Sequence, residues 1–255
     1  MTTIIAIGNQ KGGVAKTTTC LSLGAALAEL GQTVLLIDTD PQSSLTLSLG
    51  VQPDELRHSV DDALLGGASL MSVSRESSVF GLDLVPAGRG LQTVDKILYS
   101  RANYEYNLKT ALDALPPGAY DTVLIDCPPT LAALTWNALT AADQLIIPVQ
   151  CEYYAARALR QVIELVKTVR TQTNPHLRYR VLVTMYDRRD NISRVIYEQL
   201  QQGLGVALFN TVIEVDAKLR ESPVYNQPVT IYAPATRGAE QYRALARELL
   251  LKRDA

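Results

Sequence analysis

The chain has 255 residues and a formal net charge of −2, and 47% of its residues are hydrophobic. This length suits one substantial core, and no linker rich in proline, serine or glycine divides the chain, so we predict a single domain over residues 1–255. No apolar run approaches the roughly 18 residues that a membrane-spanning helix needs. The cysteines are widely spaced without a C-x-x-C pair, which favours reduced thiols in a cytoplasmic protein over disulfides or a metal site.

The charge is unevenly distributed along the chain. Residues 1–156 carry 8 Lys and Arg against 16 Asp and Glu, whereas residues 157–255 carry 16 against 10. A basic C-terminal part is a hint of a polyanionic partner. Solvated helix faces would give the same imbalance, and on charge alone that interpretation is favoured.

Short apolar runs alternate with longer helical patterns, which predicts an α/β fold with a mostly parallel central sheet and helices on both faces. The runs at 34–37 and 123–125 are continuously apolar, as expected of strands buried on both sides. In such a sheet, ligands bind beyond the carboxyl ends of the strands. We expect strands near residues 3–8, 33–38, 82–85, 121–126, 144–149, 179–184 and 207–212, and helices near residues 16–30, 59–65, 105–115, 131–142, 153–173, 190–203 and 238–252.

The first expected strand runs into a glycine-rich loop with two lysines, Lys11 and Lys16. Backbone amides between a glycine-rich turn and a helix start suit a phosphate group, and the amides of residues 12–18 are expected to surround it. Gly12 and Gly13 are expected where the backbone approaches the ligand too closely for a Cβ atom.

The loop departs from the ordinary P-loop pattern, G-x-x-x-x-G-K-[ST]. That pattern would require glycine at positions 10 and 15, where this chain has Gln10 and Ala15. If position 15 requires a positive φ, alanine there costs about 1 kcal/mol. The loop is therefore a variant with a second cation, Lys11.

Acidic residues end two of the later strands. Asp38 and Asp40 end the strand near 33–38, and Asp126 ends the strand near 121–126. Carboxylates suit phosphoryl transfer, which depends on positioning and charge stabilisation more than on covalent chemistry. Spacing alone does not decide which of Asp38 and Asp40 is more important.

Together these motifs resemble the deviant Walker A ATPases of the ParA and MinD class, and are most similar to the small Soj-type ParA partition ATPases. The resemblance runs nearly from end to end, with the motifs in the same order. It rests on residues 11–17, 35–42, 123–129, 148–155 and 184–249.

The resemblance implies a deviant Walker P-loop NTPase that binds ATP and Mg²⁺ and hydrolyses ATP. Lys16 would reach the β- and γ-phosphates, Asp40 would orient the attacking water, and Lys11 would reach the nucleotide of a partner subunit. The implied catalytic residues are Lys11, Lys16, Asp38 and Asp40, and the implied metal site comprises Thr17, Asp126 through water, and Asp38. The implied nucleotide-binding residues are Lys11, Gly12, Gly13, Val14, Ala15, Lys16, Thr17, Thr18, Met185, Glu214, Val215 and Asp216.

The C-terminal part departs from the family pattern. The usual Ile-Pro-Arg-Asn segment is replaced by residues 213–216, so base contact is expected to differ. Lys218 matches an arginine implicated in DNA contact in the family. The expected DNA-contacting residues are Arg188, Arg189, Arg194, Lys218, Arg220 and Arg237; ordinary surface salt bridges are the alternative for each.

The resemblance implies a partition or positioning ATPase. Its ATP-bound homodimer would bind double-stranded DNA without sequence preference. A ParB-like or cargo-adaptor protein would stimulate hydrolysis and release the dimer. The cargo, a plasmid, a chromosome region or a protein assembly, would thus be distributed over the nucleoid. The expected location is cytoplasmic and nucleoid-associated, without a membrane partner.

Two alternatives remain open. A MinD-like ATPase would bind a membrane through a C-terminal amphipathic helix, and residues 243–255 lack Phe and Trp for that purpose. A metal-cluster or metabolic P-loop enzyme would need paired cysteines or a further substrate domain, and neither is evident in the sequence.

Overall fold

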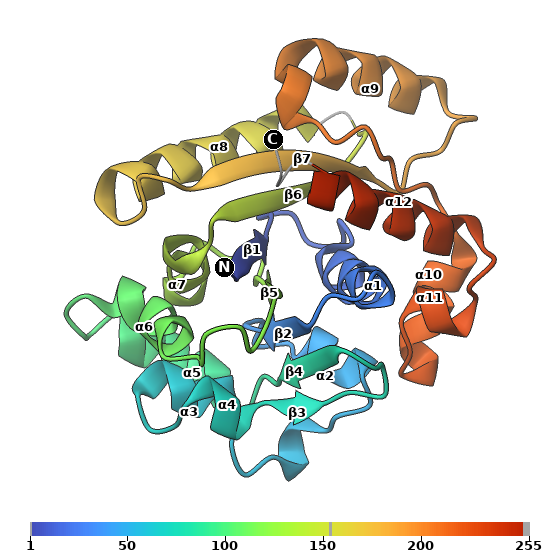
Figure 1. The fold of residues 1–255 in the computed structure, drawn as a ribbon. Coiled ribbons are helices and arrows are strands. Elements are labelled where there is room, and N and C mark those ends of the chain that lie inside the picture. Colours follow the sequence, from blue (N-terminus) through green and yellow to red (C-terminus); the bar gives the residue numbers. More distant parts are fainter. Residues whose placement is uncertain (1, 153–154, 252–255) are drawn as a thin grey trace.

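The computed structural model describes residues 2–152 and 155–251, and these form a seven-stranded sheet with helices on both faces (Figure 1). The strand order is β3-β4-β2-β5-β1-β6-β7, and neighbouring strands are parallel except for the antiparallel pair β3 and β4. This confirms the predicted fold class. The strands are β1 (Thr3–Ile7), β2 (Val34–Asp38), β3 (Arg75–Glu76), β4 (Leu82–Val85), β5 (Thr122–Asp126), β6 (Gln144–Gln150) and β7 (Arg178–Thr184).

Two hydrophobic cores cover the two faces of the sheet. Both β2 and β5 are buried along their whole length, as their continuously apolar runs predict. One core includes α1 (Lys16–Glu29), α2 (Ser44–Ser48), α10 (Ala217–Glu221), α11 (Val229–Tyr232) and α12 (Arg237–Leu251). The other includes α3 (Val60–Leu65), α4 (Leu70–Val73), α5 (Leu91–Leu98), α6 (Asn107–Asp113), α7 (Ala133–Ala141), α8 (Ala155–Gln172) and α9 (Asn191–Leu204).

The remaining short elements are 3₁₀ turns at Pro53–Glu55, Tyr104–Tyr106, Gly205–Ala207 and Ser222–Tyr225. Helix α5 and the short helices α2, α4, α10 and α11 were not predicted from the sequence pattern. Of the expected helices, residues 153, 154 and 252 lie outside the described part of the chain.

The strand expected at 207–212 is wrong. This segment begins in a 3₁₀ turn and meets β7 through an isolated bridge between Val181 and Leu208. Beyond it, the backbone N–H groups of Asn210 and Thr211 donate to the Glu248 carboxylate of α12, at 3.0 and 2.9 Å. The Glu248 side chain therefore accepts from two successive backbone N–H groups of this segment, while Phe209 N and Ile213 N donate to the Val181 and Val183 carbonyls of β7.

The last helix, α12, is held against α1. Tyr242, Leu245 and Leu249 of α12 are buried, and the Tyr242 hydroxyl lies 3.1 Å from Thr19 Oγ1 in α1. The apolar face of α12 is therefore used for packing. Within residues 2–152 and 155–251, no helix combines the length and the apolar character needed to cross a bilayer.

Candidate functional site

The glycine-rich loop joins the end of β1 to the start of α1, beyond the carboxyl end of the sheet. Ala15 occupies the N-cap position of α1 with φ 63° and ψ 34°, in the left-handed region. The positive φ considered from the sequence is therefore present, at a cost of about 1 kcal/mol for a residue with a Cβ atom. A strained backbone at this position is typical of a ligand-binding loop.

The two glycines differ in what the protein itself requires of them. A Cβ atom built at Gly12 or Gly13 meets no protein atom within 4 Å, so the protein itself does not exclude a side chain there. Gly13 has φ +74°, which favours glycine on conformational grounds. The crowding expected at Gly12 would have to come from a bound phosphate.

Two side chains fix the course of the loop, one within it and one on β7. Buried Asn9 accepts a hydrogen bond from Lys11 N through Oδ1, and donates one to the Pro148 carbonyl at the end of β6. Thr184 Oγ1, at the end of β7, donates to the Val14 carbonyl at 3.1 Å. Sequence reasoning did not identify Asn9, whose partners become apparent only when β1 and β6 lie side by side.

Lys16 lies inside the loop. Its side chain is largely buried, and its ammonium donates to the Lys11 carbonyl at 3.3 Å. A buried ammonium beside the amides of a helix start favours an anion at this position.

Thr17 and Asp126 meet beneath the loop. Thr17 Oγ1 donates to Asp126 Oδ2 at 2.7 Å, and Asp126 Oδ1 is buried without a hydrogen-bond partner among the described residues. Burial, with the charge of Asp38 beside it, raises the pKa of Asp126 well above its usual range. A cation near the free oxygen would offset both effects, so these residues fit a magnesium ion held by Thr17 and, through water, by Asp126.

Asp38 lies opposite Asp126 in the register of β2 and β5. Its Oδ1 accepts from Asp40 N at 3.0 Å, and its Oδ2 accepts from Thr46 N and Thr46 Oγ1 at 2.9 and 2.7 Å. Burial raises the pKa of Asp38 to about 6, although these hydrogen bonds lower it. Both of its oxygens are thus engaged in holding the turn that carries Asp40, which favours a positioning role over the expected metal contact.

The Lys11 side chain points to the last residue of β6 and to the chain that follows it. Its ammonium lies 3.1 Å from Gln150 Oε1 and 2.5 Å from Glu152 Oε2. The ion pair is partly exposed, with 36% of the Lys11 side chain and 54% of the Glu152 side chain accessible. Lys16 and Lys11 are thus separated, one buried in the loop and the other on its outer edge. Neither Gln150 nor Glu152 was among the expected site residues.

The expected base-contacting residues gather beside the loop. Met185, Glu214, Val215 and Asp216 line one cavity with Ala15 and Thr18, so two distant parts of the chain meet there. Met185 has φ 52° and, like Ala15, is a non-glycine residue in the left-handed region. Ile213, Leu219, Arg220 and Tyr242 complete the lining, so the exposed Arg220, an expected DNA-contacting residue, also borders this cavity.

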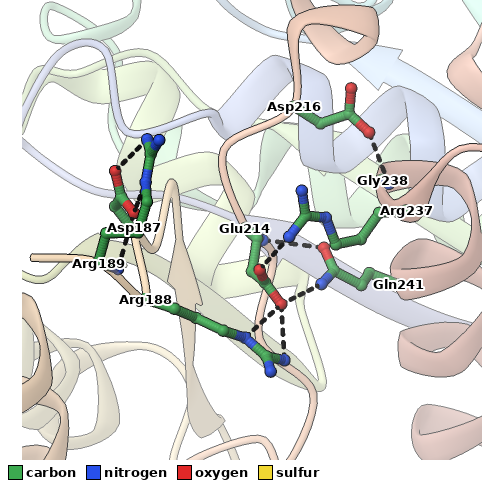
Figure 2. Close-up of polar contacts among 8 residues, drawn as sticks. All are labelled: Asp187, Arg188, Arg189, Glu214, Asp216, Arg237, Gly238 and Gln241. Atoms are coloured by element: carbon green, nitrogen blue, oxygen red, sulfur yellow. Dashed lines mark hydrogen bonds and ion pairs between the residues drawn. The ribbon is translucent and has the colours of Figure 1, made fainter.

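Most of the expected DNA-contacting residues form ion pairs or hydrogen bonds within the chain, as Figure 2 shows for Arg188, Arg189 and Arg237. Arg188 and Arg237 both pair with Glu214, whereas Arg189 pairs with Asp187. Outside that view, Lys218 pairs with Glu221 and Arg194 donates to Asn191. In a single subunit these basic residues are therefore paired within the chain, and their contact with DNA stays a prediction. Gln241, one turn after Arg237 on α12, completes the Glu214 cluster and was not predicted.

Comparisons with known proteins cover nearly the whole chain. A family model described as an AAA domain matches residues 2–179. The chain is 42% identical to the sporulation initiation inhibitor protein Soj of Bacillus subtilis, over 96% of this chain and 97% of Soj. It is 40% identical to the chromosome partitioning protein ParA of Caulobacter vibrioides, over 97% of this chain and 93% of ParA.

Solved structures with the same fold include nucleotide complexes. A Mycobacterium smegmatis protein named cobyrinic acid a,c-diamide synthase, with bound ADP and magnesium, is 40% identical with a TM-score of 0.86, over 98% of this chain and 94% of that one. The septum site-determining protein MinD of Pyrococcus horikoshii, complexed with Mg-ADP, is 28% identical with a TM-score of 0.80, over 98% and 96%.

Proposed function

Because this chain belongs to the family of the Soj and ParA chromosome partitioning proteins, we propose that it is an Mg²⁺-dependent partition ATPase that dimerises with ATP and binds DNA in that state. The observation that carries the proposal is the separation of the two loop lysines. Lys16 is buried beside the helix start, where its own phosphates would lie, whereas Lys11 lies on the outer edge. A second, outward cation suits the nucleotide of another subunit.

ATP would bind along the loop, with its phosphates at the amides of residues 12–18 and at Lys16, and its base in the cavity lined by Met185 and residues 213–216. Thr17 and Asp126 would hold magnesium, which when bound offsets phosphate charge. The ADP and magnesium in the Mycobacterium smegmatis relative support this assignment.

Asp40 is proposed to orient the attacking water. Both oxygens of Asp38 are engaged by Asp40 N and Thr46, so Asp38 fixes the turn, and Asp40 is the carboxylate better placed to bind water. Lys11 of each subunit would then leave Glu152 and contact the phosphates of the partner's nucleotide, acting as a cation supplied in trans.

The ATP dimer is proposed to bind double-stranded DNA without sequence preference, through phosphate contacts from residues 157–251. A ParB-like or cargo-adaptor protein would stimulate hydrolysis and release the dimer. A cytoplasmic, nucleoid-associated cycle of this kind would distribute a plasmid, a chromosome region or a protein cargo.

The variant Asp40→Ala tests this proposal. It keeps Lys16, Thr17 and Asp126, so it should bind ATP and dimerise, but it should hydrolyse ATP slowly and stay on DNA. Retention on unrelated duplexes at low salt, measured with ATP and with ADP, is the readout. Lys16→Ala is the control and should show neither ATP binding nor retention, because it lacks the buried ammonium.

Two results would redirect the proposal. An Asp40→Ala dimer that ignores DNA and sediments with anionic liposomes would favour the MinD-like alternative. Because the apolar face of α12 packs on α1, such binding would have to use other residues. If the variant binds neither DNA nor liposomes, the remaining alternative for this chain is a metabolic P-loop enzyme.

A further inference from the structure

Glu214 lies between two cavities. The segment 213–216 lines the cavity of about 40 Å³ beside Ala15 and Thr18, where the base of ATP is proposed to bind. Glu214 also lines a second cavity, of about 440 Å³, with Arg188 and Arg194. Glu214 is therefore shared by the cavity proposed for the base and by the cavity lined with Arg188 and Arg194.

The Glu214 carboxylate is buried, yet it anchors two exposed arginines (Figure 2). Its Oε1 accepts from Arg188 Nε at 2.9 Å and from Gln241 Nε2 at 3.0 Å, and its Oε2 accepts from Arg237 Nη1 at 2.6 Å. The side chain of Arg188 is 75% exposed and that of Arg237 is 60% exposed. One carboxylate thus offsets half of the charge of two guanidinium groups and fixes their direction. We call Glu214, Arg188, Arg237 and Gln241 the Glu214 clasp.

A DNA phosphate would compete poorly for these arginines while the clasp is closed. A pair with a buried carboxylate is screened less by water and salt than a pair with a phosphate at the surface. Leaving Glu214 buried and unpaired would also carry a large desolvation cost.

Entry of the nucleotide base would move the segment 213–216, which carries Glu214. A cavity of about 40 Å³ has room for on the order of three water molecules, and a purine ring needs more space. The segment is held to the chain after β7 by two hydrogen bonds, Tyr186 N to the Ile213 carbonyl and Val215 N to the Tyr186 carbonyl, at 3.1 and 3.2 Å. Widening the cavity on this side would shift Glu214 relative to Arg188 and Arg237.

We propose that Glu214 is a positioning residue that couples the nucleotide site to DNA binding, by holding Arg188 and Arg237 in the closed clasp until a bound base displaces the 213–216 segment. The inference rests on the proposed DNA-binding function and explains how the nucleotide-free and ATP-bound forms would come to differ in it; ADP carries the same base, so the ADP and ATP forms would differ through dimerisation instead. The arginines, once released, would each contact a DNA phosphate.

The test compares Glu214→Gln with two matched controls, Asp187→Asn and Glu221→Gln. Each variant removes one acidic charge beside a basic residue, Arg189 or Lys218 in the controls, but only Glu214 lines the base cavity. DNA affinity is measured without nucleotide and with a non-hydrolysable ATP analogue over a range of salt concentrations. Glu214→Gln should raise the affinity of the nucleotide-free form and bring the two forms closer together. The salt slope of its nucleotide-free form should steepen by about one to two, because each phosphate contact contributes about 0.9.

The two control variants, Asp187→Asn and Glu221→Gln, should bind DNA more tightly than the wild type, by a similar factor in both forms. A second pair of variants, Arg188→Met and Arg237→Met, covers the case in which Glu214→Gln folds poorly. Each should weaken binding of the ATP form and leave the nucleotide-free form nearly unchanged.

An unchanged ratio between the two forms in Glu214→Gln, or weaker binding in both, would overturn the inference while the proposed function stands. Loss of DNA binding in both forms of Arg188→Met and Arg237→Met would overturn it as well. If the ATP form of the wild-type protein and of every variant fails to bind duplex DNA at about 50 mM salt, the proposed function fails and the inference fails with it.

Discussion

Lys11 and Lys16 lie five residues apart, but their side chains have opposite surroundings. Lys16 is buried beneath the loop, whereas Lys11 is paired with Glu152 at the surface. An exposed ion pair of this kind contributes about 0–1 kcal/mol, so Lys11 can leave Glu152 at little cost. A closed dimer interface would offer Lys11 a stronger partner, because phosphate charge buried there needs compensation.

We therefore expect Lys11→Ala to bind ATP as a monomer and to fail to dimerise. Nucleotide affinity, measured by calorimetry, should stay within about threefold of the wild type, a change of less than 1 kcal/mol. Light scattering with ATP should show no dimer. Glu152→Ala is the control and should dimerise at least as well as the wild type. A normal ATP-dependent dimer of Lys11→Ala would exclude the trans role.

The buried carboxylate of Asp38 predicts how the stability of the protein depends on pH. Burial raises its pKa to about 6, above a value of about 3.9 in the unfolded chain. Between these values the folded protein holds a proton that the unfolded chain has lost. The contribution of Asp38 to stability is therefore most favourable below about pH 4 and falls by roughly 2–3 kcal/mol as the pH rises through 6.

The measurement is the free energy of unfolding of nucleotide-free wild type and Asp38→Asn by chemical denaturation between about pH 4.5 and 7.5, a window that spans most of the interval between the two pKa values. The lost hydrogen bonds give Asp38→Asn an offset that does not depend on pH. On top of that offset, the variant should gain stability relative to the wild type as the pH rises. A difference that stays constant with pH would contradict a raised pKa.

At the residue scale, the sequence predicted the site best where motifs end strands. Thr17 and Asp126 meet because the parallel strands β1 and β5 bring their carboxyl ends to one edge of the sheet. The partners of Lys11 were missed, although Glu152 lay in a recognised motif. A pairing across 141 positions depends on β1 and β6 being neighbours, and spacing within a motif does not encode that.

At the scale of elements, the segment after α9 shows how a side chain can replace a strand. Glu248 of α12 accepts from Asn210 N, Thr211 N and Thr211 Oγ1, and pairs with Arg180 of β7 at 2.5 Å. The apolar pattern at 207–212 could not predict this, because the competing acceptor lies 37 residues away from Thr211. Burial acts to raise the pKa of Glu248, but these hydrogen bonds together lower it.

Glu248→Gln should destabilise the protein by about 3–5 kcal/mol, because it leaves a buried guanidinium without its countercharge. Arg180 is itself buried against Phe209, and its Nε and Nη1 already lack partners among the described residues. Thermal and chemical denaturation give the measurement. Glu198→Gln, an exposed position on α9, is the control and should change stability by less than about 0.5 kcal/mol. A loss of stability below about 1 kcal/mol in Glu248→Gln would show that the hydrogen bonds and the ion pair of Glu248 do not stabilise the fold.

For the whole molecule, the structure qualifies the charge imbalance. The excess of basic residues lies in the part of the chain that forms β7 and α9 to α12, as the sequence indicates. Several of these charges are offset locally, by Glu214, Asp187, Glu221 and Glu248. A single subunit therefore presents fewer unpaired basic side chains than the count of 16 Lys and Arg in residues 157–255 implies. DNA binding would depend on bringing two subunits to one duplex, where weak contacts gain by multivalency.

Charge reversal on this face is the whole-molecule prediction. Lys218→Glu should weaken binding of the ATP form to every duplex alike, and should make the slope of log affinity against log salt shallower by about one. We prefer Lys218 to Arg220 because Arg220 lines the base cavity, so its replacement would alter nucleotide and DNA binding together. Lys109→Glu is the matched control, since Lys109 is also paired with an acidic residue but lies on α6, in the acidic part of the chain. A loss of affinity equal to that of Lys109→Glu would show that only net charge matters, and would remove the C-terminal face from the DNA interface.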